Sequence, residues 1–206
     1  MAGRRAPIGA EPGDDGTHFR VWAPAHRVLD VVLLEPSAGE VADALVVERR
    51  ETVPLEAEPG GYFSGFVPGA EPGDLYFFGL EDGSLSPDPA SRFQPVGPFG
   101  PSEIIDPSTF EWTDERWPGL ARHEHVIYEI HLGTFTPEGT WSAAEARLGG
   151  LADLGVRTVE LMPVAEFPGK FGWATTGWTC SRPRACTARR TTSGASSTGR
   201  TRKGWG

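Results

Sequence analysis

The sequence predicts a mainly β protein: an immunoglobulin-like β-sandwich, then a single βαβ unit, then a tail without a core. Two observations predict this arrangement. Short alternating apolar segments separated by turn residues fill residues 16–84, which is typical of a sandwich. A strand, helix and strand pattern follows at residues 126–162, which indicates two parallel strands joined by a crossover helix.

Composition indicates a soluble globular protein. Hydrophobic residues make up 38% of the 206 positions and charged residues 23%. The 27 Gly and 19 Pro exceed one fifth of the chain, which favours many turns. No apolar run approaches 18 residues, and no apolar segment follows the basic residues at the start. We therefore expect no membrane span, no secretory signal and a cytoplasmic location.

The sandwich is expected over residues 16–84, after a disordered N-terminus at residues 1–15. Aromatic and β-branched residues alternate with polar ones, and proline or glycine ends most segments. The expected strands are residues 18–22, 28–34, 44–48, 51–55, 61–67 and 75–80. Exposed aromatic rings on such a module can stack on sugars, but we predict that Phe19, Phe63 and Phe77 belong to the core.

Residues 85–125 are rich in proline and show little periodicity, so we expect a linker and loops. Their aromatic residues, among them Phe93, Trp112 and Trp117, are too many for a flexible tether. The segment is therefore expected to be ordered.

The βαβ unit is predicted from three consecutive patterns. Residues 126–132 form an almost continuous apolar run, as in a parallel strand covered on both faces. Ser142 and Glu145 form a capping box that opens a helix, and Gly155 closes it. Residues 157–162 form the second strand.

Residues 174–206 hold seven basic residues, no acidic ones, and no Leu, Ile, Val, Phe or Met. Such a segment cannot bury enough apolar surface to fold, so we expect disorder. Its arginines lack any periodicity, which argues against nucleic-acid binding. Cys180 and Cys186 have no histidine near them, so no metal site and no cofactor are expected.

Four segments resemble the malto-oligosyltrehalose trehalohydrolase family of the α-amylase superfamily. They are residues 19–24 (FRVWAP), 88–95 (DPASRFQP), 126–139 (VIYEIHLGTFTPEG) and 160–167 (ELMPVAEF). The second and third segments favour this family over glycogen branching and debranching relatives. The resemblance covers residues 8–173.

The resemblance implies that residues 126–173 are the start of an incomplete (β/α)8 barrel. It also implies retaining hydrolysis of the α-1,4 bond beside the terminal trehalose unit of maltooligosyl trehalose. That α-glucan is the expected partner. In the family, an Asp nucleophile, a Glu acid/base and a second Asp follow barrel strands four, five and seven. This sequence has two such strands, so no catalytic residue is assigned.

Two residues are candidates for substrate binding, because barrel sites lie beyond the C-terminal ends of the strands. His131 follows the first strand and Glu166 the second. A structural role is the alternative for each, as a hydrogen-bond partner for His131 and as a loop-orienting group for Glu166.

The pattern of the family ends at Trp173. The family continues with Gly-Tyr-Asp-Gly, whereas this chain has Ala-Thr-Thr-Gly at residues 174–177. Deleting one G from the codons TGG GGC TAC GAC GGG changes Trp-Gly-Tyr-Asp-Gly into Trp-Ala-Thr-Thr-Gly. We therefore predict a frameshift, an out-of-frame tail and an inactive polypeptide. The alternatives are a fragment of a branching or debranching enzyme and a free-standing glucan-binding module.

Overall fold

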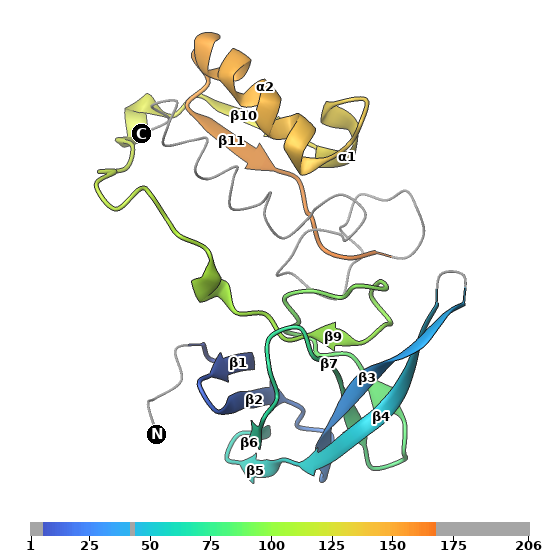
Figure 1. The fold of residues 1–206 in the computed structure, drawn as a ribbon. Helices are drawn as coiled ribbons and strands as arrows, with labels where there is room; N and C mark the ends of the chain where they lie inside the picture. The colour runs from blue at the N-terminus through green and yellow to red at the C-terminus, as the bar shows by residue number, and fades with distance from the viewer. Residues whose placement is uncertain (1–5, 42–43, 168–206) are drawn as a thin grey trace.

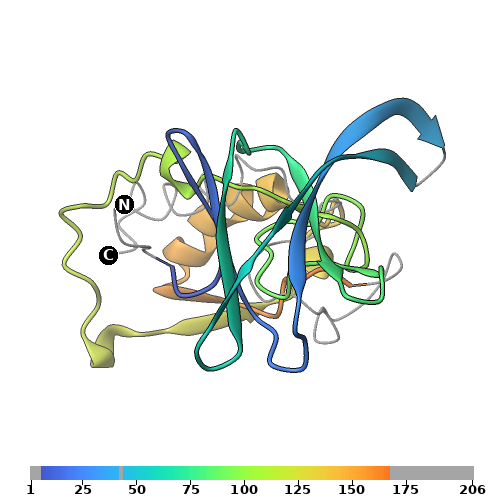
Figure 2. The same ribbon diagram turned by 90° about the horizontal axis from the view of Figure 1, so that it is seen from below.

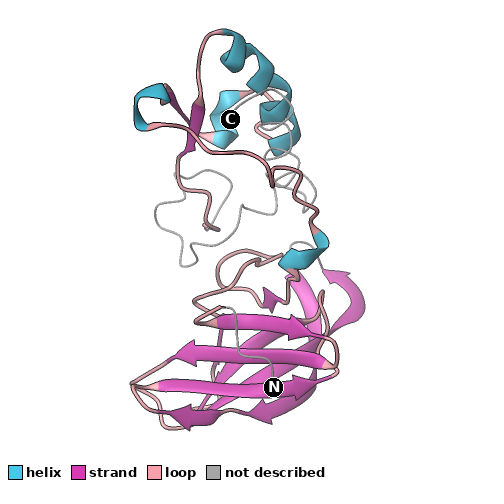
Figure 3. Cartoon of the chain, turned by 90° about the vertical axis from the view of Figure 1, so that its left-hand side faces the viewer, coloured by secondary structure: helices cyan, strands magenta, loops and turns pink. Residues whose placement is uncertain are grey.

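The computed structural model describes residues 6–41 and 44–167 (Figure 1). The predicted tail at residues 174–206, with Cys180 and Cys186, lies outside these described residues. Strands dominate one part of the fold, and a smaller part holds the helices (Figure 3). This confirms the predicted fold class: a β-sandwich followed by one βαβ unit that does not close into a barrel.

The sandwich consists of two antiparallel sheets. The first has the order β1-β2-β6-β5, and the second has the order β4-β3-β7-β8, with β9 also paired to β7. The first sheet comprises β1 (Gly9–Gly13), β2 (Gly16–Trp22), β6 (Tyr62–Pro68) and β5 (Glu56–Glu58). The second comprises β4 (Ala44–Pro54), β3 (Leu29–Val41), β7 (Leu75–Leu80), β8 (Leu85–Ser86) and β9 (Ser102–Glu103). Figure 2 shows β3 and β4 extending together beyond the other strands.

The core lies between the two sheets and follows the alternation of the sequence. Phe19 and Phe63 are buried there, as predicted, and Phe19 packs edge-on against Tyr76 with ring centroids 4.9 Å apart. Phe77 points to the opposite face of its sheet, because neighbouring strand residues alternate in direction. It is half-buried there, beside the buried Val32, Leu34 and Leu75.

The sandwich begins earlier than predicted. β1 pairs with β2 from Gly9 to Gly13, so the prediction of disorder through residue 15 is wrong for the described residues. Residues 9–13 therefore belong to the sheet, although apolar and polar residues do not alternate in this segment. The strands predicted at residues 44–48 and 51–55 form one strand, β4, which pairs with β3 through bulges.

The sandwich also ends later than residue 84. β8 and β9 both pair with β7, and Ile104 is fully buried in the core. The loop between these strands is fixed by Asp88, a buried carboxylate that accepts hydrogen bonds from Tyr76 Oη (2.6 Å) and the Ala90 amide (2.7 Å). Side-chain hydrogen bonds, which leave no periodic pattern in a sequence, therefore attach residues 85–105 to the sandwich.

The rest of the predicted linker has no sheet. It contains two short 3-10 helices, Pro107–Thr109 and Arg122–Glu124. Phe110 and Trp112 pack edge-to-face with centroids 4.9 Å apart. The segment is thus an ordered connection from the sandwich to the βαβ unit (Figure 3).

The βαβ unit comprises β10 (Ile127–Ile130), α1 (Leu132–Phe135), α2 (Trp141–Asp153) and β11 (Thr158–Leu161). β10 and β11 pair in parallel, with Ile127 opposite Thr158, as predicted. The predicted capping box at Ser142 is wrong. Thr140 is the N-cap, and its side chain accepts a hydrogen bond from the Ala143 amide (3.3 Å), so the helix begins one residue before Ser142.

The prediction that the first parallel strand is covered on both faces is also wrong. α2 packs on the unit through Leu148, near Val156 and Val159. Three of the four residues of β10 are exposed, and only Ile130 is buried. One helix cannot cover both faces of a two-stranded sheet, so apolar strand residues stay in contact with solvent. Among the described residues, no helix has the length and apolar character needed to cross a membrane.

Candidate functional site

The two predicted site residues lie beyond the carboxyl ends of adjacent parallel strands. His131 directly follows β10, and Glu166 lies five residues after the end of β11. Because the strands are parallel and paired, both residues follow the same edge of the sheet. The structure thus gives them the placement that the sequence predicts, and their role in substrate binding stays a prediction.

His131 is held at the start of α1. Its carbonyl accepts hydrogen bonds from the Thr134 and Phe135 amides, both at 3.0 Å. Its ring nitrogen Nδ1 lies 3.3 Å from Thr134 Oγ1, and the side chain is half-buried. Gly133 lies against the ring, since a Cβ there would be 3.2 Å from Cε1. The imidazole is therefore positioned by the α1 turn while keeping part of its surface accessible.

Glu166 is different because it is almost fully buried, at 3% exposure. A carboxylate in such a place needs partners inside the protein, and Glu166 has an interaction partner. Its neighbour Ala165 is also buried. Burial favours the alternative in which Glu166 orients the loop after β11.

A second candidate site lies in the sandwich, and sequence reasoning missed it. A pocket of about 240 Å³ opens where β2 leads into the loop at residues 23–26. Its lining includes Trp22, Pro24, His26, Phe78, Ser86 and Pro89. Strand parity was the available signal: Phe19 and Val21 point into the core, so Trp22 must point outward.

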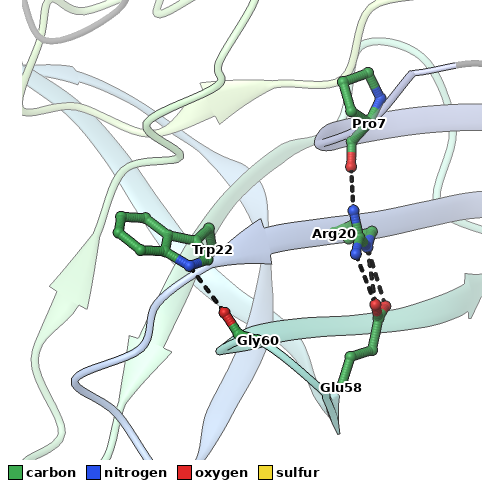
Figure 4. A network of polar contacts seen from close by, with 5 residues as sticks. All are labelled: Pro7, Arg20, Trp22, Glu58 and Gly60. Atoms are coloured by element: carbon green, nitrogen blue, oxygen red, sulfur yellow. Dashed lines mark hydrogen bonds and ion pairs between the residues drawn. The ribbon is translucent and has the colours of Figure 1, made fainter.

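Trp22 is fixed although it is exposed. Its indole Nε1 donates a hydrogen bond to the Gly60 carbonyl at 3.0 Å, and the larger ring extends away from Gly60 (Figure 4). On the same strand, Arg20 donates to both carboxylate oxygens of Glu58 and to the Pro7 carbonyl (Figure 4). These bonds tie β2 to β5 and to the segment before β1.

The described residues include no group of three or more His, Cys, Asp or Glu side chains able to hold a metal ion.

Comparison with known proteins identifies the relatives of this chain. No family model matches it. It is 40% identical over 170 residues to the malto-oligosyltrehalose trehalohydrolase of Saccharolobus solfataricus, covering 82% of this chain and 28% of that protein. The Deinococcus radiodurans enzyme of the same name is 39% identical over 175 residues, covering 84% and 26%. The chain is related in sequence to the malto-oligosyltrehalose trehalohydrolases. It spans about a quarter of the length of these curated relatives.

This relationship confirms the resemblance predicted from the four segments. A branching enzyme of Streptomyces avermitilis is also similar, at 35% identity over 188 residues, covering 83% of this chain and 21% of that protein. The fold agrees with the α-amylase superfamily. A crystal structure from Salmonella typhimurium, named as an alpha amylase, has a TM-score of 0.79 at 34% identity, covering 97% of this chain and 32% of that one.

A pullulanase from Anoxybacillus, solved with maltotetraose, has a TM-score of 0.70 at 20% identity. It covers 93% of this chain and 31% of that one, and it supports the fold alone. The sequence similarity to the trehalohydrolases and the shared superfamily fold together relate the chain to glycoside hydrolases.

Proposed function

We propose that this chain is part of an enzyme that hydrolyses the α-1,4-glucosidic bond of maltooligosyl trehalose and releases trehalose. The observations that support the proposal are the 39–40% identity to two trehalohydrolases and the presence of the two segments that favour this family over the branching and debranching enzymes. The segments at residues 88–95 and 131–139, which favour this family, both lie in described structure. The first anchors a loop to the sandwich through Asp88, and the second forms the turn that holds His131.

We assign none of the three catalytic carboxylates of the family to a residue of this chain. A retaining glycosidase requires an acid/base and a nucleophile with carboxyl groups about 5–5.5 Å apart. The family places both after later barrel strands than the two present here. We therefore propose that the 206-residue polypeptide is inactive and that a frameshift after Trp173 explains its last residues. That segment lies outside the described residues.

The experiment that tests the enzyme class uses a reading frame restored after codon 173 and extended to full length. Maltooligosyl trehalose is the substrate, and the products are separated by chromatography. Release of free trehalose supports the proposal. Transfer of glucan chains to new branch points, or cleavage of existing branch points, would instead place the protein with the branching or debranching enzymes.

The inactivity proposal has its own test. The 206-residue chain, purified free of host hydrolases, is incubated with the same substrate beside a boiled sample. We expect no trehalose above the boiled control. Trehalose release by this chain would overturn the proposal, and DNA sequencing around codon 174 would decide the frameshift independently.

A glucan-binding role for the sandwich is a second candidate, and one observation favours it. Trp22 is 57% exposed beside a pocket, although large aromatic side chains are usually covered. Binding without chemistry requires only the sandwich and is compatible with an inactive polypeptide.

A further inference from the structure

We propose that Trp22 and the adjoining pocket form a binding subsite for one glucosyl unit of an α-1,4-glucan. The inference rests on the proposed function for its choice of sugar, and on the geometry of the sandwich for the site itself. The pocket lies where β2, the loop at residues 23–26, β7 and the segment after β8 meet. It belongs to the sandwich, whereas His131 and Glu166 belong to the βαβ unit.

The first element of the subsite is a preformed aromatic platform. Trp22 is held by its bond from Nε1 to the Gly60 carbonyl, so binding does not need to order the side chain. Because that bond occupies the polar edge of the indole, the exposed surface is its apolar ring (Figure 4). A sugar ring presents C–H groups on its faces, and those groups pack on an aromatic face.

The loops around Trp22 are locked to each other. The Ala23 amide donates to the Gly61 carbonyl at 2.9 Å. Gly61 has a φ of +81°, and a Cβ on it would lie 2.6 Å from Pro24 Cβ. Only glycine permits this contact between the two loops. The platform therefore belongs to a rigid end of the sandwich.

The second element of the subsite is the lining of the pocket, which has an apolar base and polar groups around it. Leu29 and Phe78 are almost fully buried beneath the pocket, so they form an apolar base. His26 and Ser86 supply polar groups that can bond to sugar hydroxyls, and His26 Nδ1 lies 3.7 Å from Glu81. Ligand pockets usually span about 300–1,000 Å³, so about 240 Å³ suits one sugar ring rather than a long buried chain.

The choice of an α-glucan follows from the relatives. The curated relatives are named for malto-oligosyltrehalose. An open apolar pocket with a few polar groups takes the end of such a chain and leaves its remaining units in solvent. The subsite would thus anchor substrate on the sandwich.

The test is binding of maltohexaose to the full 206-residue chain, measured by titration calorimetry. We expect saturable binding that Trp22→Ala weakens at least about tenfold, as expected when an aromatic anchor is removed. Trp22→Phe keeps a ring and should lose less. The matched control is Trp112→Ala, because Trp112 has the same 57% exposure but lies outside the pocket.

Thermal melting of each variant verifies that the sandwich remains folded. Unchanged maltohexaose affinity in Trp22→Ala would overturn the subsite, as would an equal loss in Trp112→Ala. Equal affinity of the wild-type chain for cellohexaose would overturn the assignment to α-linked glucans. Failure here leaves trehalose release by the restored enzyme untouched, so the two proposals fail separately.

Discussion

At the residue scale, the ion pair between Arg20 and Glu58 connects two strands of the first sheet, β2 and β5. Arg20 Nε and Nη2 both bond to the carboxylate, the shortest at 2.8 Å, and the guanidinium lies 4.0 Å from the centroid of the Tyr62 ring. The bonds from Arg20 and then Ser64 lower the pKa of Glu58 from 4.5 to about 2. The pair therefore favours the ionised carboxylate in the folded state.

We predict that Arg20→Met raises the pKa of Glu58 toward 4.5 and destabilises the sandwich only slightly, since solvent screens the partly exposed pair. A lowered pKa stabilises the fold at pH values above 4.5, and this contribution disappears as the pH falls through about 2. Denaturant melts of both proteins should therefore differ at pH 6 and converge near pH 2. Arg50→Met is the control, because Arg50 pairs with Asp74 instead; an equal shift of Glu58 in that variant would contradict the assignment.

The buried Tyr76–Asp88 contact is the second residue-scale feature. Both side chains are almost fully buried, and Tyr76 Oη donates to the carboxylate at 2.6 Å. Burial first, and then Asp88, raise the pKa of Tyr76, so its hydroxyl keeps its proton and remains a donor. Tyr76→Phe should cost about 1–3 kcal/mol, because Asp88 loses a partner in a place that water does not reach.

Urea unfolding measures this cost. Tyr62→Phe is the matched control, because Tyr62 is only half-buried, and a surface change of this kind stays within about 0.5 kcal/mol. Equal stability of the Tyr76→Phe protein and the wild type would show that the hydroxyl does not hold the loop at residues 87–101.

At the scale of elements, the N-terminus of α2 distinguishes two adjacent hydroxyl residues. Thr140 accepts the bond from the Ala143 amide, whereas Ser142 lies inside the helix and is exposed. We predict that Thr140→Ala lowers the stability of the βαβ unit by about 1 kcal/mol. Ser142→Ala should be neutral or slightly stabilising, because alanine is the better helix former. Hydrogen exchange of the α2 amides measures both, and the reverse order would restore the capping box at Ser142.

Most of the elements that could be predicted have a regular pattern of apolar residues, and this pattern marks the side that packs into the core. β2 and β6 alternate, so their residues and the core positions of Phe19 and Phe63 followed from the sequence. β7 is apolar almost throughout, so its position followed from the sequence but the face of Phe77 did not. β1, β8 and β9 are short and lack that alternation. Pairing with longer strands and the bonds of Asp88 and Arg92 hold them, and such long-range contacts leave no local signal.

The candidate sites also divide into features with a local sequence signal and features that depend on long-range contacts. His131 and Glu166 could be placed because the sequence predicts where the two parallel strands end. The burial of Glu166 could not be predicted, since it depends on how the irregular segment at residues 162–167 packs. The Trp22 pocket combines four separate segments, and only strand parity pointed to one of its walls.

At the scale of the whole molecule, the sandwich has a core enclosed between two sheets, whereas the βαβ unit leaves apolar strand residues exposed. The sandwich has a continuous core that includes Ile104. We predict that residues 6–106 alone melt cooperatively, and that residues 16–84 melt at a lower temperature, because the shorter fragment lacks β1, β8, β9 and Ile104. Circular dichroism melts compare the two. Equal melting temperatures would mean that these additions do not stabilise the sandwich.

The exposed strands of the βαβ unit should determine the solubility of the full chain. Val126 is 52% and Ile127 is 58% exposed, and they lie beside or in a two-stranded sheet whose outer edges have no partner among the described strands. An exposed apolar strand edge is a template for pairing with another chain. We therefore predict that the full chain aggregates at concentrations where residues 6–106 stay soluble, and that Ile127→Lys reduces this aggregation. Val28→Lys is the matched control, because Val28 is 53% exposed on the sandwich. Light scattering at equal protein concentration measures all four proteins. Equal improvement by both lysine variants would attribute solubility to net charge, whereas improvement by Ile127→Lys alone assigns aggregation to β10.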